Sequence, residues 1–92
     1  MSDQVYFPIS QNWSTEEVID VVQFFEVVHQ AYMKGASREE IMSAYRAFQQ
    51  VVPSKSEEKQ HFKEYEKQSG EIPFYVVRNA KQAKAGAIIR MN

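Results

Sequence analysis

The amino-acid sequence predicts an all-α fold, and three observations support that prediction. A serine is followed three residues later by a glutamate at three places, glycine or proline stands near the end of each expected helix, and apolar residues recur at helical spacing between these signals. We therefore expect a small bundle of about four helices behind an extended N-terminal segment, with the helices over residues 15–34, 38–52, 55–69 and 74–85.

The length and composition of the chain indicate one globular domain without covalent cross-links. Its 92 residues are too few for two hydrophobic cores, so we expect a single helical domain over residues 1–92. Hydrophobic residues make up 43% of the chain and charged residues 25%, which excludes wholesale disorder. The absence of cysteine excludes a disulfide scaffold, a cysteine nucleophile and thiolate metal sites, and it is compatible with a reducing cytoplasm.

The sequence indicates neither a signal peptide nor a membrane span. The N-terminus MSDQVYFPIS has no basic region followed by an apolar run, and the most apolar stretch, VIDVVQFFEVV, is interrupted by Asp20, Gln23 and Glu26. We therefore expect a cytoplasmic protein that is not attached to a membrane.

Three of the four predicted helices begin with the same pair of residues. A serine at the N-cap can accept a hydrogen bond from the backbone N–H of the third helical residue, and a glutamate at that third position can accept from the N-cap N–H. The exchange satisfies two of the donors that a helix start leaves open. The pairs are Ser14 with Glu17, Ser37 with Glu40, and Ser54 with Glu57.

The first predicted helix has an unusually wide apolar sector. Phe24, Val27 and Ala31 extend this sector well beyond the stripe of an ordinary amphipathic helix. Either the neighbouring helices cover the added surface, or part of it contacts a second chain. The three residues are therefore the candidate surface for a protein interaction, including self-association, and Gly35 marks the end of the helix.

The second and third predicted helices differ in polarity. The helix over 38–52 has one apolar and one polar face and ends before Pro53, which cannot continue it. The helix over 55–69 is mostly polar, and its main apolar anchors are Phe62 and Tyr65. Both helices are therefore expected to bury one side only.

The last predicted helix starts in an ambiguous stretch, because FYVV also has the composition of a strand. We predict a helix, since Pro73 suits a first turn and the sequence contains no second convincing strand to pair with FYVV. Gly86 should end this helix, and residues 87–92 should form a flexible tail. At the other terminus, residues 1–13 should lie extended across the bundle, with Tyr6, Phe7 and Ile9 as contacts.

The charge of the chain is unevenly distributed. Residues 1–52 contain three Lys or Arg against seven Asp or Glu, a formal charge of −4, whereas residues 53–92 contain eight against five, a charge of +3. Lysines recur at every fourth position of the third helix. A solvated helix surface explains this pattern, and an anion-binding surface is the alternative. The residues of that surface would be Lys55, Lys59, Lys63, Lys67, Arg78, Lys81 and Lys84.

The two histidines each follow a glutamate by three positions. Glu26 with His29 and Glu58 with His61 have the Glu-x-x-His spacing by which some helical bundles hold paired metal ions. The further carboxylates that such a site needs are missing from the fourth helix, so these four residues are weak metal candidates. The sequence has no glycine-rich phosphate loop and no nucleophile motif. We therefore expect no cofactor and no catalytic residues.

Three sequence blocks resemble a known family. NWSTEEVIDVVQFFEVVHQAY, AYRAFQQVVPSKSEEKQ and FKEYEKQSG occur in this order, and the chain from residue 6 to about 85 is similar to the YktA-like family of uncharacterised small proteins from Bacillus, Enterococcus and related Gram-positive bacteria. The resemblance implies a small, all-helical cytoplasmic domain. It implies no activity and no site residues, because the family has no known function.

The sequence contains the start, stop and periodicity signals of a helical fold, but it contains no complete motif for catalysis, cofactor binding or metal binding. The sequence therefore predicts a non-enzymatic, cytoplasmic protein-interaction module of unknown biochemical function, which binds an unidentified protein or a second copy of itself. The alternative is a protein that binds nucleic acid through its basic C-terminal half. A more remote alternative is a carboxylate and histidine metal protein.

Overall fold

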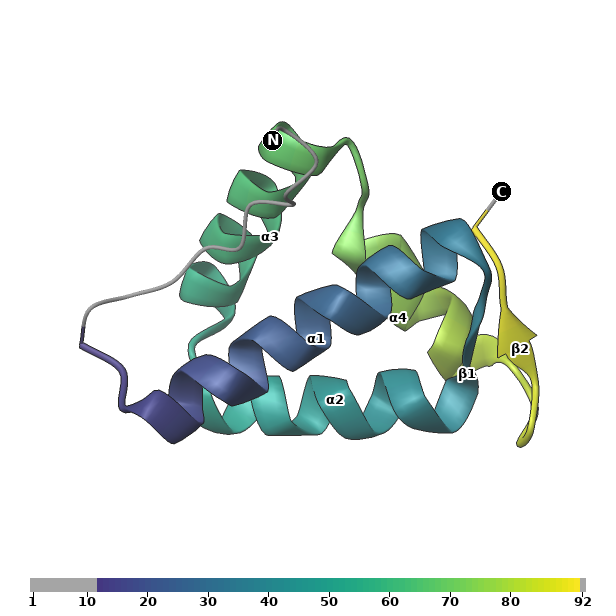
Figure 1. Ribbon diagram of the computed structural model, residues 1–92, viewed down its shortest axis with the longest axis horizontal. Coiled ribbons are helices and arrows are strands. Elements are labelled where there is room, and N and C mark those ends of the chain that lie inside the picture. The colour runs from purple at the N-terminus through teal and green to yellow at the C-terminus, as the bar shows by residue number, and fades with distance from the viewer. Residues whose placement is uncertain (1–11, 92) are drawn as a thin grey trace.

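The computed structural model describes residues 12–91 and confirms the predicted all-α fold. Two short strands, which the sequence did not predict, accompany the helices (Figure 1). The elements follow one another in the order α1 (Thr15–Met33), β1 (Ala36–Ser37), α2 (Arg38–Val51), α3 (Lys55–Ser69), α4 (Pro73–Gln82) and β2 (Ile88–Ile89). Residues 1–11, to which we assigned the contacts of Tyr6, Phe7 and Ile9, lie outside the described part.

The predicted serine caps start the first three helices. Ser14 and Ser37 each exchange both hydrogen bonds of the capping box with the glutamate three residues later. At the start of α3 the serine half is present, since Ser54 Oγ accepts a hydrogen bond from the Glu57 N–H over 3.4 Å. These bonds satisfy backbone donors locally, which is why the boundaries could be located from sequence.

The fourth helix confirms the helical interpretation of FYVV but is shorter than predicted. It begins at Pro73 and ends at Gln82, rather than running from 74 to 85. Ala83 already has an extended conformation, with φ −85° and ψ 161°. The chain thus leaves the helix before Gly86, whose φ of 82° serves the turn that leads into β2.

The core is built mainly from aromatic rings on three helices. Phe24 of α1 lies 4.9 Å from Phe48 of α2 and is stacked 5.7 Å from Phe62 of α3, measured between ring centroids. Phe25 of α1 stacks on Tyr65 of α3 at 4.6 Å. The otherwise polar helix α3 is therefore attached through its two predicted anchors, because large buried rings contribute most of the packing energy of a small core.

The wide apolar sector of α1 is covered within the chain, and this corrects our candidate interaction surface. Phe24 is 0% exposed and Ala31 is 1% exposed, and Val27 packs partly buried against the same core. The alternative in which neighbouring helices cover the sector is therefore the one that the structure adopts. The physical reason is that α1 is contacted by aromatic rings from both α2 and α3.

The C-terminal residues dock against the bundle, which corrects the expectation of a flexible tail over 87–92 for the described residues up to 91. The strand β2 pairs antiparallel with β1, with Ala36 opposite Ile89. The Ile89 side chain is only 7% exposed, and the Met91 N–H donates to the Ala31 carbonyl over 3.1 Å. Burial of an isoleucine and pairing of backbone groups hold this segment in place.

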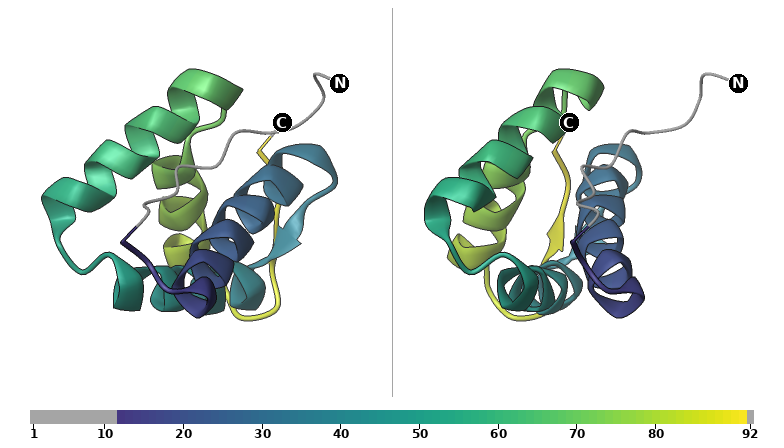
Figure 2. Two further views of the ribbon diagram at one scale, coloured as in Figure 1. Left: turned by 60° about the vertical axis from the view of Figure 1, so that its left-hand side comes forward. Right: turned by 90° about the vertical axis from the view of Figure 1, so that its left-hand side faces the viewer.

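The helices are arranged so that α3 and α4 lie on one side of the molecule and α1 lies on the other (Figure 2). The helix α2 runs along the base in both views of the figure. The helices α3 and α4 are joined by a short connection and run in opposite directions (Figure 1). This helical hairpin, closed at one end by its connection, forms the site described next.

Candidate functional site

A groove with a volume of about 830 Å³ lies between α3 and α4, and Tyr45 of α2 also contributes to its lining. Lys55, near the start of α3, and Lys81, near the end of α4, both approach the Tyr45 ring. The opposite end of the groove is formed by residues next to the connection between the helices, among them Ile72 and Phe74. The groove therefore follows the helical hairpin along its length.

The floor of the groove is apolar. Phe62 of α3 and Pro73 and Val77 of α4 line it, and all three belong to the buried part of the molecule. Phe74 also lines the groove, although 58% of its surface is exposed to solvent. Phe74 thus adds an exposed ring to the buried apolar floor of the groove.

The rim of the groove is cationic. The cations that line the groove are Lys55, Lys59, Lys63, Arg78 and Lys81. Among residues 12–91, only Lys55 of these five forms an ion pair, with its Nζ atom 3.6 Å from Oε1 of Glu58. The other four have no ion-pair partner within the described chain, and Glu66 is the second carboxylate on the lining.

Five of the seven residues in the predicted anion-binding surface thus meet at one place, and two do not. Lys67 lines a second, smaller hollow on α3, and Lys84 is an exposed residue beyond the end of α4 that lines neither hollow. The helical hairpin explains the difference. It brings α3 and α4 together, whereas Lys84 lies past the last turn of α4. Lys67 lies one turn beyond Lys63, in a neighbouring hollow that shares residues with the groove but is not the groove itself.

A buried carboxylate anchors the end of the groove next to α2. Glu58 is 8% exposed and is the one buried charged residue in the described chain. The Tyr45 hydroxyl donates to Glu58 Oε2 over 2.9 Å, and Lys55 Nζ donates to the Tyr45 oxygen over 3.2 Å. Each polar group of the three has a partner, as a buried charge requires.

The surroundings of Tyr45 and Lys55 alter the pKa values of these two groups. Burial raises the pKa of Tyr45 above its usual value, and the hydrogen bond to the Glu58 carboxylate raises this pKa further. The hydrogen bond to Tyr45, followed by the attraction of Glu58, raises the pKa of Lys55. Tyr45 thus holds its proton more firmly than a free tyrosine does, and its hydroxyl directs that proton to Glu58.

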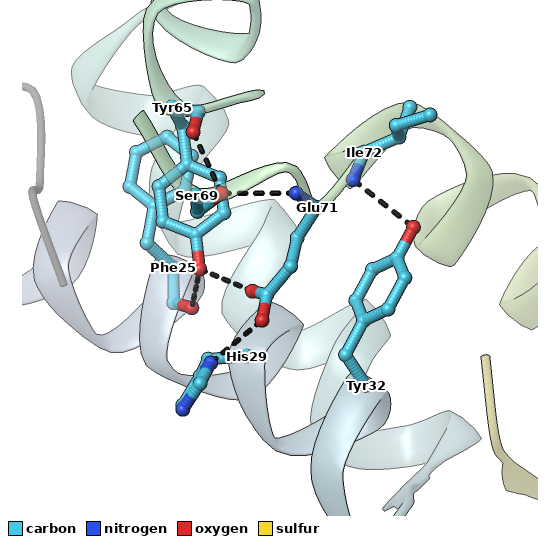
Figure 3. Close-up of polar contacts among 7 residues, drawn as sticks. All are labelled: Phe25, His29, Tyr32, Tyr65, Ser69, Glu71 and Ile72. Atoms are coloured by element: carbon cyan, nitrogen blue, oxygen red, sulfur yellow. Dashed lines mark hydrogen bonds and ion pairs between the residues drawn. The ribbon is translucent and has the colours of Figure 1, made fainter. Parts of the chain in front are cut away.

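The connection between α3 and α4 is held against α1 by a second polar cluster (Figure 3). The Glu71 carboxylate lies between two partners, with Oε1 accepting from the Tyr65 hydroxyl over 2.6 Å and Oε2 lying 2.8 Å from His29 Nδ1. The Ile72 N–H donates to the Tyr32 hydroxyl over 3.0 Å. These contacts place the closed end of the hairpin, and with it the groove, relative to α1.

Burial of the Tyr65 ring is the main reason that its pKa lies far above the usual value, and the bond to Glu71 adds to the effect. Ser69 links the backbones of the two residues, because its hydroxyl donates to the Tyr65 carbonyl and accepts from the Glu71 N–H. Tyr65 and Glu71 are therefore joined through both side chain and backbone at the end of α3.

Three of the four metal candidates have other partners in the structure, and the fourth, Glu26, is exposed. His29 contacts Glu71 rather than Glu26, which is exposed, and Glu58 is bonded to Tyr45. The His61 ring lies 5.3 Å from the Trp13 ring, measured between centroids. Over residues 12–91 no three His, Asp or Glu side chains are grouped so that they would hold a metal ion. The Glu-x-x-His spacing places two side chains on one face of a helix, but it does not by itself bring that helix next to the second Glu-x-x-His pair.

Sequence reasoning missed the exposed aromatic pair in the first turn of α4. Phe74 and Tyr75 are 58% and 41% exposed, and the Arg78 guanidinium lies 4.6 Å from the Tyr75 ring centroid. A usable signal was present, because four consecutive apolar residues in a short helix cannot all face one side. Val76 and Val77 take the buried positions and leave the two rings in solvent.

The described helices also bear on the prediction about membranes. Within residues 12–91, none combines the length and the apolar character needed to cross a bilayer.

Comparison with known proteins finds relatives over nearly the whole chain. A family model described as "Uncharacterised protein family (UPF0223)" matches residues 4–89. A UPF0223 protein of Lysinibacillus sphaericus is 51% identical over 92% of this chain and 90% of its own. The UPF0223 protein YktA of Bacillus subtilis is 46% identical over 84% of this chain and 88% of its own, and a relative from Oceanobacillus iheyensis is 46% identical over 89% and 93%.

Proposed function

The chain belongs to the UPF0223 family of uncharacterised proteins, and we propose that it is a non-enzymatic interaction module whose groove binds an acidic, amphipathic helix of a protein partner. The family membership confirms the resemblance inferred from sequence, and no function is assigned to the family. The proposal therefore rests on the groove itself.

One observation supports this function above the others, namely four cations without ion-pair partners around an apolar floor. Lys59, Lys63, Arg78 and Lys81 line the groove, and none of them lies within ion-pair distance of a carboxylate of the described chain. A partner that supplies carboxylates would gain Coulomb energy in a partly desolvated place. The same partner would cover Phe74 and Val77 with apolar side chains.

The dimensions of the groove suit a helix of three to four turns. The wall formed by α3 is 15 residues long, which corresponds to roughly 22 Å at the rise of an α-helix. Lys55, Lys59 and Lys63 follow one another along that wall at intervals of four residues. A partner helix with apolar residues at positions i, i+3, i+4 and i+7 would place one apolar stripe on the floor and its flanking carboxylates against both rims.

The apolar floor also favours a protein over nucleic acid as the partner. A phosphate backbone would satisfy the cations but would leave the rings and aliphatic side chains uncovered. Base stacking needs exposed ring faces, and Phe62 is largely buried against Phe24 and Phe48. Phe74 and Tyr75 remain as exposed rings, so nucleic-acid binding is retained as an outcome of the test.

The test uses a designed, fluorescein-labelled peptide of 16 residues with leucine at positions i, i+3, i+4 and i+7 of each repeat and glutamate elsewhere. We expect its fluorescence anisotropy to rise with added protein, and we expect a twin peptide with lysine in place of glutamate not to bind. A scrambled acidic peptide without the apolar stripe should bind at least tenfold more weakly, because charge alone does not fill the floor.

Matched substitutions locate the binding. The double variant Lys59→Gln and Lys63→Gln should weaken peptide binding at least tenfold, whereas Lys67→Gln with Lys84→Gln removes the same charge outside the groove and should leave binding within about twofold. If both double variants weaken peptide binding equally, the groove is not the binding site. Tighter binding of fluorescein-labelled single-stranded DNA than of the peptide, with the same dependence on Lys59 and Lys63, would replace the proposal by nucleic-acid association.

A further inference from the structure

The outer face of α1 is acidic and polar apart from one isoleucine. Glu16, Ile19, Asp20, Gln23 and Glu26 fall on one face of the helix, because residues three and four apart share a side. We call these five residues the acidic ridge. Three of them are carboxylates, and none of the three forms an ion pair within residues 12–91.

The acidic ridge also presents an apolar side chain to solvent. Ile19 is 49% exposed and lies between the carboxylates, while the opposite side of α1 is buried in the core through Phe24, Phe25 and Val28. An isolated exposed isoleucine is ordinary on a protein surface. Here it stands in the middle of an unpaired acidic helix face, which offers one apolar side chain to the floor of the groove and carboxylates to its cationic rim.

We propose that the partner of the groove is a second copy of this chain, which docks the acidic ridge of its α1 between α3 and α4. The inference rests on the proposed function and names its partner. The ridge and the groove are separate surfaces, since no ridge residue lines the groove, and the helix α1 lies on the other side of the molecule from α3 and α4 (Figure 2). Each chain therefore has one surface that can dock, the acidic ridge, and one surface that can receive it, the groove.

Charge supports this pairing in the intact protein. The half of the chain that contains the ridge has a formal charge of −4, and the half that contains the groove has a charge of +3. With a net charge of −1, long-range repulsion between copies is small, and the attraction between unlike surfaces decides the orientation of the encounter. Because two different surfaces meet, the contact is heterologous and builds a ring or an open chain unless two copies close on each other.

The experiment measures mass by size-exclusion chromatography with light scattering and by analytical ultracentrifugation, at high micromolar protein and low salt. We expect a mass above the monomer value of 10.7 kDa that returns to the monomer value when salt is raised to about 0.5 M, where charge interactions at the surface are screened. A protein that remains monomeric at low salt up to about millimolar concentration overturns the inference.

Two variants and their controls test the surfaces separately. The groove variant, Lys59→Gln with Lys63→Gln, and the ridge variant, Glu16→Gln with Glu26→Gln, should each weaken self-association at least tenfold. The groove control is Lys67→Gln with Lys84→Gln. The ridge control is Glu57→Gln with Glu64→Gln, which removes the same two charges from exposed positions on α3 that do not line the groove. Both controls should associate as the wild type does.

Mixing the two variants gives the sharpest readout. Each variant alone should be monomeric, but an equimolar mixture should form a one-to-one dimer, because the intact ridge of one chain meets the intact groove of the other. A mixture that stays monomeric, or controls that lose association as the variants do, would overturn the proposed pairing.

The failure of this inference can be distinguished from the failure of the proposed function. If the wild type is monomeric but still binds the acidic peptide through Lys59 and Lys63, the groove functions and its partner is another protein. If neither the peptide nor a second copy binds, both proposals fall together.

Discussion

The Tyr65 hydroxyl donates a hydrogen bond to Glu71 Oε1 over 2.6 Å, and this bond joins the last turns of α3 to the connection that leads into α4. On its other oxygen, Glu71 contacts His29 of α1. One carboxylate therefore links three parts of the chain at the closed end of the groove (Figure 3). The bond has two consequences that can be measured, one for stability and one for the response to alkaline pH.

Replacing Tyr65 by phenylalanine should lower the free energy of unfolding by about 2 kcal/mol, because the ring is fully buried and the lost bond is made to a charged group. Urea denaturation followed by circular dichroism measures the change. Tyr75→Phe is the control, since Tyr75 is 41% exposed and its ring contact with Arg78 survives the substitution. The control should stay within about 0.5 kcal/mol of the wild type.

The stability of the protein should fall as the pH rises above about 10. The pKa of Tyr65 is raised in the folded state, so the unfolded chain loses this proton first and the folded chain retains it. The stabilisation is fully present below the unfolded pKa of about 10 and decreases at about 1.4 kcal/mol per pH unit above it. Urea denaturation at a series of pH values should show this decline.

The Tyr65→Phe variant separates this effect from the titration of the lysines. Its decline above pH 10 should be shallower than that of the wild type by the contribution of one tyrosine. Tyr45, whose pKa is also raised, should account for part of the decline that remains. Parallel curves for the variant and the wild type would contradict the raised pKa of Tyr65.

Truncation of Phe24 tests whether the wide sector of α1 is core or surface. Phe24→Ala should cost about 3–5 kcal/mol, because the ring is 0% exposed and contacts Phe48 and Phe62. Ile19→Ala, on the exposed face of the same helix, should cost less than about 1 kcal/mol. If Phe24→Ala lowers the free energy of unfolding no more than Ile19→Ala does, Phe24 is not part of the core. If Phe24→Ala does not fold, Phe24→Leu gives the same comparison with a smaller cavity.

The docking of the C-terminus should be visible in a second pair of substitutions. Ile89→Ala removes a side chain that is 7% exposed and should cost about 2 kcal/mol, whereas Ile88→Ala removes one that is 51% exposed and should cost little. Thermal or urea denaturation distinguishes the two. Equal and negligible effects would mean that the tail contributes nothing to stability.

Two glycines with positive φ allow backbone strain to be separated from crowding. Gly70, with φ 78°, has no atom within 4 Å of an added Cβ, so Gly70→Ala should cost only the left-handed conformation, about 1–2 kcal/mol. At Gly35, with φ 101°, the added Cβ would lie 3.0 Å from side-chain atoms of Arg90 and Ile88. Gly35→Ala should therefore be the more destabilising of the two in urea denaturation, and the reverse order would argue against the docked position of the tail.

The sequence identified most of the cations of the candidate site, but it did not show that they lie together around one groove. The regular lysines of α3 were recognised, and Lys55, Lys59 and Lys63 do line the groove with Arg78 and Lys81. Their convergence depends on the angle between α3 and α4, which is set by the contacts of Glu71 and Ile72 with residues about 40 positions away. No local pattern reports such contacts.

The starts of the first three helices could be predicted from the sequence, because helix-capping signals act over three or four residues. Ser14 and Ser37 cap α1 and α2 as predicted, and α3 has the predicted bounds. Three features could be found only from the packed structure: His29 contacts Glu71 rather than Glu26, Ile89 returns to pair with Ala36, and the cations surround an apolar groove. The physical reason is the range of the interactions: caps and helical periodicity are satisfied between neighbours in the chain, whereas packing selects among distant partners only once the helices have come together.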